Sequence, residues 1–251
     1  MKFYIIILIN ILTKNQEKAQ SMEISEFDKI ISLFLNQFAQ KSLFLDKFIN
    51  SLSNSGILRG GVIMALNWWC WTRYDGKIDV IAIKVIFGAT LAPFFTKFIQ
   101  NYMPYRLRPL HNPDLGFLTI IEKNVLEEWT SFPSDTAVFF FALSTGVWLY
   151  SRKCGMFAFV WSAIVVCMPR IYLGLHYVTD IIGGAAFGFA IMIFVFLIPL
   201  PPRVKEIFDD LQQRHAKLFY AVMFLVTFEL AYVFEDVRPL LGALRYIWAS
   251  L

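Results

Sequence analysis

Six long apolar stretches follow one another along the chain, and they limit the possible folds more than any other feature of the sequence. They run approximately over Ile57–Trp71, Val80–Tyr102, Asp135–Tyr150, Met156–Met168, Thr179–Leu200 and Leu218–Phe234. About 20 apolar helical residues cross the hydrocarbon core of a bilayer. With 57% hydrophobic and 17% charged residues, the chain also differs from soluble domains, in which about 25% of residues are charged. We therefore predict an all-α fold, a polytopic membrane helix bundle of about six transmembrane helices.

The residues before the first of these stretches are expected to lie at the membrane surface. Ser25–Gln40 has apolar residues at helical spacing, which is typical of an amphipathic helix that lies among lipid headgroups or packs on a bundle. We interpret it as an interfacial anchor rather than as part of a site. Met1–Leu12 is too short to span a bilayer, and either Met1 or Met22 can be the start. The predicted organisation has an N-terminal extension, a transmembrane core and a C-terminal tail, over 1–55, 56–235 and 236–251.

The charges of the connecting segments indicate the orientation of the helices. Basic residues gather after the first, third and fifth stretches, for example at Arg152–Lys153 and Arg203–Lys217. By the positive-inside rule these segments face the cytoplasm, so Met103–Phe132 and Arg170–His176 face outward. The net charge of +4 includes no separate basic patch of the kind that binds nucleic acids. The three cysteines have neither metal nor redox spacing, and we expect no metal and no cofactor.

Three segments place charged and polar side chains at helix ends on the predicted outer side. Lys97–Pro109 leaves the second stretch, Ser131–Ala137 begins the third, and Pro169–Asp180 joins the fourth to the fifth. Arginine matches phosphate oxygens with paired hydrogen bonds, and a serine before a helix adds the amides and the dipole of the helix N-terminus. His176 and Asp180 share a helix face, where a carboxylate orients the imidazole and stabilises its positive charge. These residue types predict phosphoryl transfer.

The three segments resemble the signature motifs of the type 2 phosphatidic acid phosphatase (PAP2) superfamily, which read K-x6-R-P, P-S-G-H and S-R-x5-H-x3-D. The third motif is complete except that Pro169 replaces its serine. The resemblance implies that 56–235 is a catalytic membrane core. We expect it in a bacterial inner membrane, with its site on the extracytoplasmic side that the loop charges indicate. The resemblance also implies a nucleophile, an orienting partner and three phosphate ligands: His176, Asp180, and Arg108, Ser134 and Arg170, respectively.

Two positions depart from the family pattern. Asn101 stands in place of the lysine of the first motif, and Lys97, one helical turn earlier, lies on the same face; we expect both near the phosphate. Thr136 is also expected there, but it replaces the histidine that protonates the leaving oxygen. General acid catalysis contributes about 10²–10⁴ in rate. A phosphate leaving group needs it less than an alcohol does, so we expect a polyprenyl diphosphate or similar lipid diphosphate to be preferred over monoesters. His111 is an alternative acid.

Several functions stay open at this level. The expected one is a membrane lipid phosphatase that acts through a phosphohistidine; a catalytically weak lipid-phosphate-binding homologue and a lipid phosphotransferase would use the same residues. A transporter or channel fits less well, because the charged residues gather at one face rather than in mid-span. Arg106 is interpreted as an electrostatic helper or headgroup anchor, and His215 receives no role. The expected partners are a lipid phosphate or diphosphate and the bilayer, and the oligomeric state is left open.

Overall fold

The computed structural model describes residues 24–72, 80–122 and 129–232, and these residues form helices and connecting loops without a β-strand. The predicted all-α class is confirmed for this part of the chain. The alternative starts at Met1 and Met22 and the C-terminal tail over 236–251 lie outside the described residues. The predicted domain limits stay predictions.

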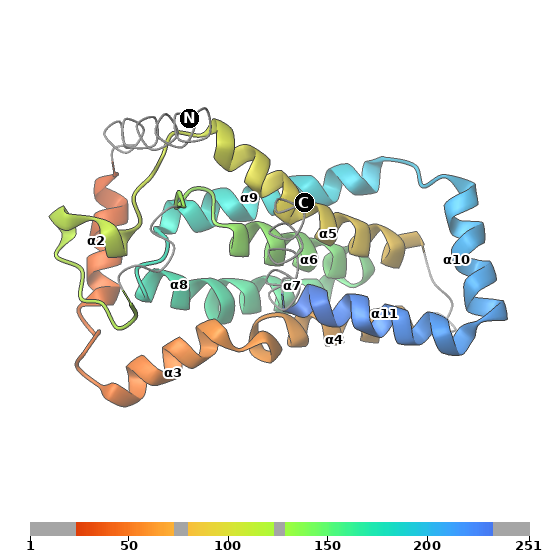
Figure 1. The fold of residues 1–251 in the computed structure, drawn as a ribbon, viewed down its shortest axis with the longest axis horizontal. Coiled ribbons are helices and arrows are strands. Elements are labelled where there is room, and N and C mark those ends of the chain that lie inside the picture. The colour runs from red at the N-terminus through yellow and green to blue at the C-terminus, as the bar shows by residue number, and fades with distance from the viewer. Residues whose placement is uncertain (1–23, 73–79, 123–128, 233–251) are drawn as a thin grey trace, which may run out of the picture.

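The middle of the bundle is formed by α6 (Asp135–Tyr150), and α5 (Val80–Tyr102) and α9 (Val178–Leu197) pack along it (Figure 1). Helix α6 is apolar on all sides, which favours this central place. The glycines of α9 allow a close approach, because a Cβ atom on Gly188 would lie 2.2 Å from the carbonyl oxygen of Val138. Small residues on one face of α9 thus let this helix pack closely against α6.

Other helices surround these three. One side is covered by helices from the first and last apolar stretches, namely the π-helical turn η1 (Ile57–Gly61), α4 (Val62–Thr72) and α11 (Ala216–Ala231). The fourth stretch is a continuous run of α7 (Arg152–Trp161), the π-helical η4 (Ser162–Cys167) and α8 (Met168–Tyr172). Figure 1 shows α10 (Pro202–Arg214) crossing one end of the bundle, and α2 (Glu26–Asn36) and α3 (Leu43–Asn54) at the other end.

Within the described residues, each of the six predicted stretches falls mostly on helix. Three segments of the described chain are long and apolar enough to cross a membrane: Val80–Tyr102, Arg152–Tyr172 and Val178–Leu197. These apolar helices support an integral membrane protein, while the number of six spans stays a prediction. The fourth stretch is longer than the predicted Met156–Met168, because charged residues at its two ends lower the local hydropathy although the helix continues through them.

Helix α2 turns its polar face toward the bundle. The buried positions recur at every fourth residue: Asp28, Ser32 and Asn36. The outward positions are large and apolar, and include Phe27, Ile30 and Phe34. The Asn36 amide both donates to and accepts from the backbone of Leu118, at 2.8 Å each. Polar contacts therefore hold α2 on the protein, while its placement among lipid headgroups stays a prediction.

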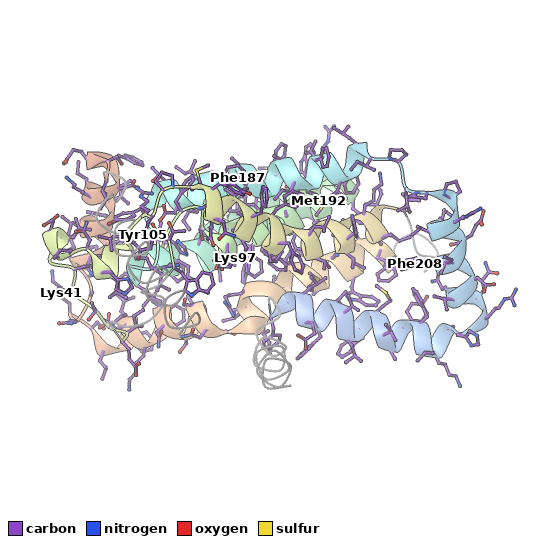
Figure 2. All side chains as sticks on the ribbon, turned by 45° about the horizontal axis from the view of Figure 1, so that its top comes forward. Lys41, Lys97, Tyr105, Phe187, Met192 and Phe208 are labelled. Atoms are coloured by element: carbon purple, nitrogen blue, oxygen red, sulfur yellow. The ribbon has the colours of Figure 1, made fainter. Side chains whose placement is uncertain are left out.

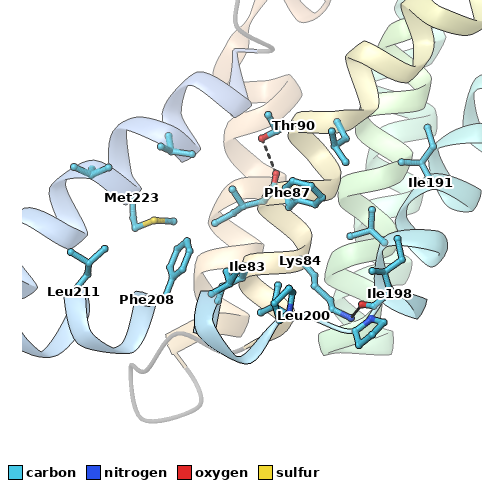
Figure 3. Close-up of a pocket in the computed structure, with 18 of the residues that line it drawn as sticks. Ile83, Lys84, Phe87, Thr90, Ile191, Ile198, Leu200, Phe208, Leu211 and Met223 are labelled. Carbon is cyan, nitrogen blue, oxygen red and sulfur yellow. Dashed lines mark hydrogen bonds between the residues drawn. The ribbon is translucent and has the colours of Figure 1, made fainter. Parts of the chain in front are cut away.

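A cavity of about 990 Å³ lies between α5, α9, α10 and α11 (Figure 3). Its walls are almost entirely apolar, and on α5 they run from Ile83 to Phe95. At its edge, the Lys84 ammonium donates to the carbonyl oxygens of Phe196 and Ile198 at 2.7 Å each, which places a positive charge at the C-terminus of α9. The cavity therefore lies beside the C-terminal half of α9, away from Asp180.

Candidate active site

The three polar segments meet at the end of the bundle that carries α2. Figure 2 shows Tyr105, from the first segment, toward this end, and Phe208 of α10 at the opposite end. The meeting point is the start of α6 and α9, where the Ser134 N–H donates to the carbonyl oxygen of Asp180 at 3.1 Å. Two helix N-termini therefore converge, and their dipoles and first amides favour an anion.

His176 lies in the loop between α8 and α9, and only 3% of its surface is exposed. Its Nδ1 atom is 2.9 Å from the carbonyl oxygen of Ser131. A carbonyl oxygen only accepts, so Nδ1 carries the proton and Nε2 keeps its lone pair. Nε2 in turn lies 3.4 Å from Nη1 of Arg108. The ring nitrogen that keeps its lone pair thus faces the Arg108 guanidinium.

Asp180 lies beside the imidazole but not in the position that the sequence suggested. Its Oδ2 atom is 3.7 Å from Nδ1 of His176, which is longer than a hydrogen bond, and it accepts the N–H of Tyr177 at 2.7 Å. Its Oδ1 atom accepts from Arg106. The tautomer of His176 is therefore set by the Ser131 carbonyl, and Asp180 acts on the ring through its charge.

The surroundings of His176 favour its neutral form. Burial and the charge of Arg108 lower the pKa of His176 from its ordinary 6.5, although the carboxylates of Asp180 and Asp135 act in the opposite direction. Burial disfavours a charged imidazolium because it removes water from the ring. A neutral imidazole keeps a lone pair and can act as a nucleophile, so the lowered pKa favours a form of His176 that is suited to this chemistry.

Arg108 is held in place by backbone carbonyls. Its side chain donates to the carbonyl oxygens of Leu175 at 2.5 Å, Thr130 at 3.3 Å and Trp129 at 3.3 Å. Within the described ranges no carboxylate lies within ion-pair distance of this guanidinium. Its positive charge is therefore oriented without being neutralised, which suits it to bind an anion.

The second motif begins α6. Ser134 caps the helix, since its Oγ accepts the N–H of Ala137 at 3.4 Å. The Thr136 hydroxyl is 3.5 Å from Oδ1 of Asp135. Four basic groups act electrostatically on the Asp135 carboxylate: His176, Lys97, Arg108 and Arg170. Asp135 therefore lies beside the basic groups of the site, although it was not among the predicted site residues; an acidic residue at the start of an apolar stretch was the signal.

The other predicted phosphate ligands differ in how close they lie to His176 and Arg108. Lys97 lies 4.0 Å from the ring centre of Trp129 and hydrogen-bonds to Gln100 at 3.0 Å. Arg170 is half-buried in α8, beside a second cavity of about 710 Å³ next to α3. Asn101 is exposed, and no hydrogen bond or ion pair among the described residues joins it to the site. Its role as a phosphate ligand stays a prediction.

Arg106 connects α2 to the site. Its guanidinium donates to Asp28 at 2.6 Å, to the Thr179 hydroxyl at 2.9 Å and to Asp180. Because Arg106 is 3% exposed, its interpretation as a headgroup anchor is wrong. Asp28 of the Ser25–Gln40 helix also contacts Arg106 and Thr179, so this helix touches residues around the site, while its interpretation as an interfacial anchor stays a prediction. No local sequence pattern pairs residues so far apart.

The structure also bears on metal binding. Over the described ranges, no group of three or more His, Cys, Asp or Glu side chains is arranged to hold a metal ion. What the site offers is a neutral imidazole, a cation held by carbonyl groups, and two helix N-termini. This set can bind a phosphate and attack it with a nitrogen nucleophile.

Several known proteins are similar to this chain in sequence. Bacitracin transport permease protein BcrC of Bacillus licheniformis is 25% identical over 176 residues, which cover 70% of this chain and 82% of BcrC. Lipid A 1-diphosphate synthase of Escherichia coli (strain K12) is 27% identical over 200 residues, which cover 72% of this chain and 80% of the synthase. YbjG of the same strain, whose name proposes undecaprenyl-diphosphatase activity, is 29% identical over 132 residues, or 50% of this chain and 60% of YbjG.

The chain is also similar to a solved structure and to a protein family. A crystal structure of a transmembrane PAP2-type phosphatidylglycerolphosphate phosphatase from Bacillus subtilis is similar, with a TM-score of 0.48 and 16% identity, over 67% of this chain and 82% of that one. The PAP2 superfamily matches residues 81–202, a range that contains all three polar segments. Residues 81–202 of this chain therefore form a PAP2 superfamily domain.

Proposed function

We propose that the protein is a membrane lipid phosphatase that hydrolyses a lipid diphosphate, such as a polyprenyl diphosphate, through a phosphohistidine at His176. The observation that carries this proposal is the environment of one atom. Nε2 of His176 keeps its lone pair because Nδ1 donates to Ser131 at 2.9 Å, and it faces the Arg108 guanidinium at 3.4 Å. A phosphate bound to Arg108 would present its phosphorus to that lone pair.

The reaction has two steps. Nε2 attacks the terminal phosphorus, and the bond from phosphorus to the bridging oxygen breaks, so that the lipid phosphate leaves with the electron pair. The Arg108 guanidinium and the amides at the starts of α6 and α9 stabilise the equatorial oxygens. Water then attacks the phosphohistidine, which releases inorganic phosphate and a proton and returns neutral His176.

The residue at position 136 supports a diphosphate rather than a monoester. The Thr136 hydroxyl lies 3.5 Å from Asp135 and does not ionise near neutral pH, so it is not a useful general acid. A departing lipid phosphate is a weak base that leaves without a proton, whereas a departing alkoxide needs one. The name of YbjG, a relative, also points to a polyprenyl diphosphate.

We also propose the placement of the site. The positive-inside rule puts Arg152–Lys153 and Arg203–Lys217 in the cytoplasm. The start of α9 then faces the extracytoplasmic side, and the relatives are bacterial proteins, which supports a bacterial inner membrane. A substrate headgroup would reach His176 from that side.

A second candidate is a lipid phosphotransferase. One relative at 27% identity is named lipid A 1-diphosphate synthase, so a member of the same group of relatives builds a lipid diphosphate. The phosphohistidine would then pass its phosphoryl group to a second lipid instead of to water. The two candidates share the first step and differ in the acceptor.

The test is phosphate release by purified protein from a polyprenyl diphosphate, a polyprenyl monophosphate and phosphatidic acid. We expect the fastest release from the diphosphate, and a loss of at least about 10³-fold in His176→Ala, because the nucleophile is removed. His215→Ala is the matched control, since His215 is exposed at the end of α10. Unchanged activity in His176→Ala would contradict the mechanism, and a phosphorylated second lipid in place of inorganic phosphate would favour the phosphotransferase.

A further inference from the structure

We propose that Asp28, on α2, is a positioning residue for catalysis, which together with Arg106 controls the place and the effective charge of Asp180 beside His176. This inference rests on the proposed function. Asp28 lies outside the PAP2 domain over 81–202, so the N-terminal part of this chain would complete the site.

The contacts of Asp28 hold the start of α9. Its Oδ1 atom accepts the N–H of Thr179 at 3.0 Å, and its Oδ2 atom accepts the Thr179 hydroxyl at 2.6 Å. The Thr179 amide belongs to the first turn of α9, where helix amides have no partner within the helix. A carboxylate at this position satisfies the amide and interacts favourably with the helix dipole. Asp28 therefore fixes the turn that carries Asp180.

Asp28 also shares a cation with Asp180. The Arg106 guanidinium donates to Oδ2 of Asp28 at 2.6 Å and to Oδ1 of Asp180, and all three side chains are buried. Burial alone would raise the pKa of Asp28, but hydrogen bonds from Thr179 and the charge of Arg106 lower it below its ordinary value. Two carboxylates thus share one guanidinium, and one negative charge is left uncompensated.

That remaining charge lies where the reaction needs it. Phosphorylation of Nε2 makes the imidazole ring cationic, because Nδ1 keeps its proton. Oδ2 of Asp180 is 3.7 Å from Nδ1, close enough for its charge to stabilise the cation in a buried site. Without Asp28, Arg106 would neutralise Asp180 alone and draw it away from the ring. Among the described residues, the other charged groups that act on His176 are Arg108, from the loop that follows α5, and Asp135, from α6.

The first test compares Asp28→Asn with Asp46→Asn. Asp46, on α3, is also a buried carboxylate of the N-terminal region, but it accepts from Tyr172 at 2.6 Å and from the Gln40 N–H at 3.0 Å, away from Arg106. In Asp28→Asn we expect kcat to fall about 10-fold, as for other outer partners of site residues. KM should stay within about twofold, because Arg108 and Ser134 are untouched.

The pH profile separates positioning from simple destabilisation. Removal of the negative charge disfavours the imidazolium, so the acid limb of kcat/KM in Asp28→Asn should move to lower pH than in the parent. In Asp46→Asn the acid limb of kcat/KM should stay at the pH of the parent protein, even if this variant is less stable to unfolding. If the two variants lose activity equally and keep the same limb, Asp28 is only structural and the inference is wrong.

A second measurement does not depend on turnover. The chain has only three histidines, so the imidazole nitrogen resonances of His176 can be assigned by their loss in His176→Ala. Their titration should shift to lower pH in Asp28→Asn and not in Asp46→Asn. If Asp28→Asn does not fold, Asp28→Ser also removes the carboxylate and should shift the titration in the same direction. An unshifted titration overturns the inference, whether or not the protein is a phosphatase.

Discussion

Nδ1 of His176 donates a hydrogen bond to the carbonyl oxygen of Ser131 over 2.9 Å. A backbone carbonyl cannot take up a proton near neutral pH, so this contact selects one tautomer over the whole working range. It therefore leaves Nε2 as the only ring nitrogen with a lone pair, and it leaves the Asp180 carboxylate to act through space. Four predictions depend on this arrangement and on the helices that support it.

The pH dependence should report a neutral nucleophile. Burial and Arg108 lower the pKa of His176 below 6.5, so the ring is more than half neutral at that pH. As the pH falls, the acid limb of kcat/KM should be centred below 6.5, because the ring takes up its proton only at lower pH than an ordinary histidine does. Profiles for a lipid diphosphate and a lipid monophosphate separate the ionisation of His176 from that of the substrate. The substrate's ionisation differs between the two lipids, whereas that of His176 is common to both. A shared acid limb centred above 6.5 would contradict the prediction.

Replacement of Thr136 by histidine should restore a general acid. We expect Thr136→His to raise the turnover of a lipid monoester by about 10–10²-fold, and to change that of a lipid diphosphate much less, because only the alkoxide needs the proton. The measurement is kcat for phosphatidic acid and for a polyprenyl diphosphate with the same preparation. Thr136→Val, which removes the hydroxyl without adding an acid, is the control. Equal gains on both substrates would contradict the explanation that only the monoester needs a general acid.

Arg108→Lys tests the guanidinium that faces Nε2. Lysine keeps the charge but loses the planar fork that can bind two phosphate oxygens at once. We expect kcat/KM to fall by roughly 10²-fold, since the lost donors stabilise the transition state. The control is Arg214→Lys, at an exposed arginine paired with Asp210 at 2.5 Å, which should leave activity unchanged. Full activity in Arg108→Lys would show that the phosphate does not bind to the Arg108 guanidinium.

The contact between α6 and α9 should tolerate no side chain at Gly188. A Cβ atom there would lie 2.2 Å from the Val138 carbonyl oxygen, so Gly188→Ala must push the two helices apart. We expect a loss of about 1–3 kcal/mol in stability, as for other overpacked positions, measured as a lower thermal midpoint in detergent. At Gly61 the nearest atom would be 3.6 Å away, on Ile57, so Gly61→Ala is the matched control. Equal midpoints would contradict the close packing.

The positions of the helices were largely predictable, because hydropathy and helix length are local properties. The stretches Val80–Tyr102 and Asp135–Tyr150 agree with α5 and α6 at both ends. The stretch Met156–Met168 was too short, because a hydropathy pattern stops at charged residues whereas helical hydrogen bonding continues to Tyr172. The number of membrane spans stays a prediction.

For the site, the sequence by itself determined which chemical groups are present. The spacing from Arg170 to His176 and Asp180, and the order of the three motifs, already pointed to a phosphate and a histidine nucleophile. Such motifs are readable because each lies within one short segment at a helix end. The departure at Thr136 was readable for the same reason.

Only the tertiary structure decided how these groups act on one another. It placed the Ser131 carbonyl, and not Asp180, on Nδ1 of His176, and a backbone atom leaves no trace in residue identity. It also turned the polar face of α2 inward, so that Asp28 meets Arg106. An amphipathic pattern shows that a helix has two faces but not which of them meets protein, because in a membrane the apolar face can lie outward. The setting of His176 therefore depends on long-range contacts that no local pattern encodes.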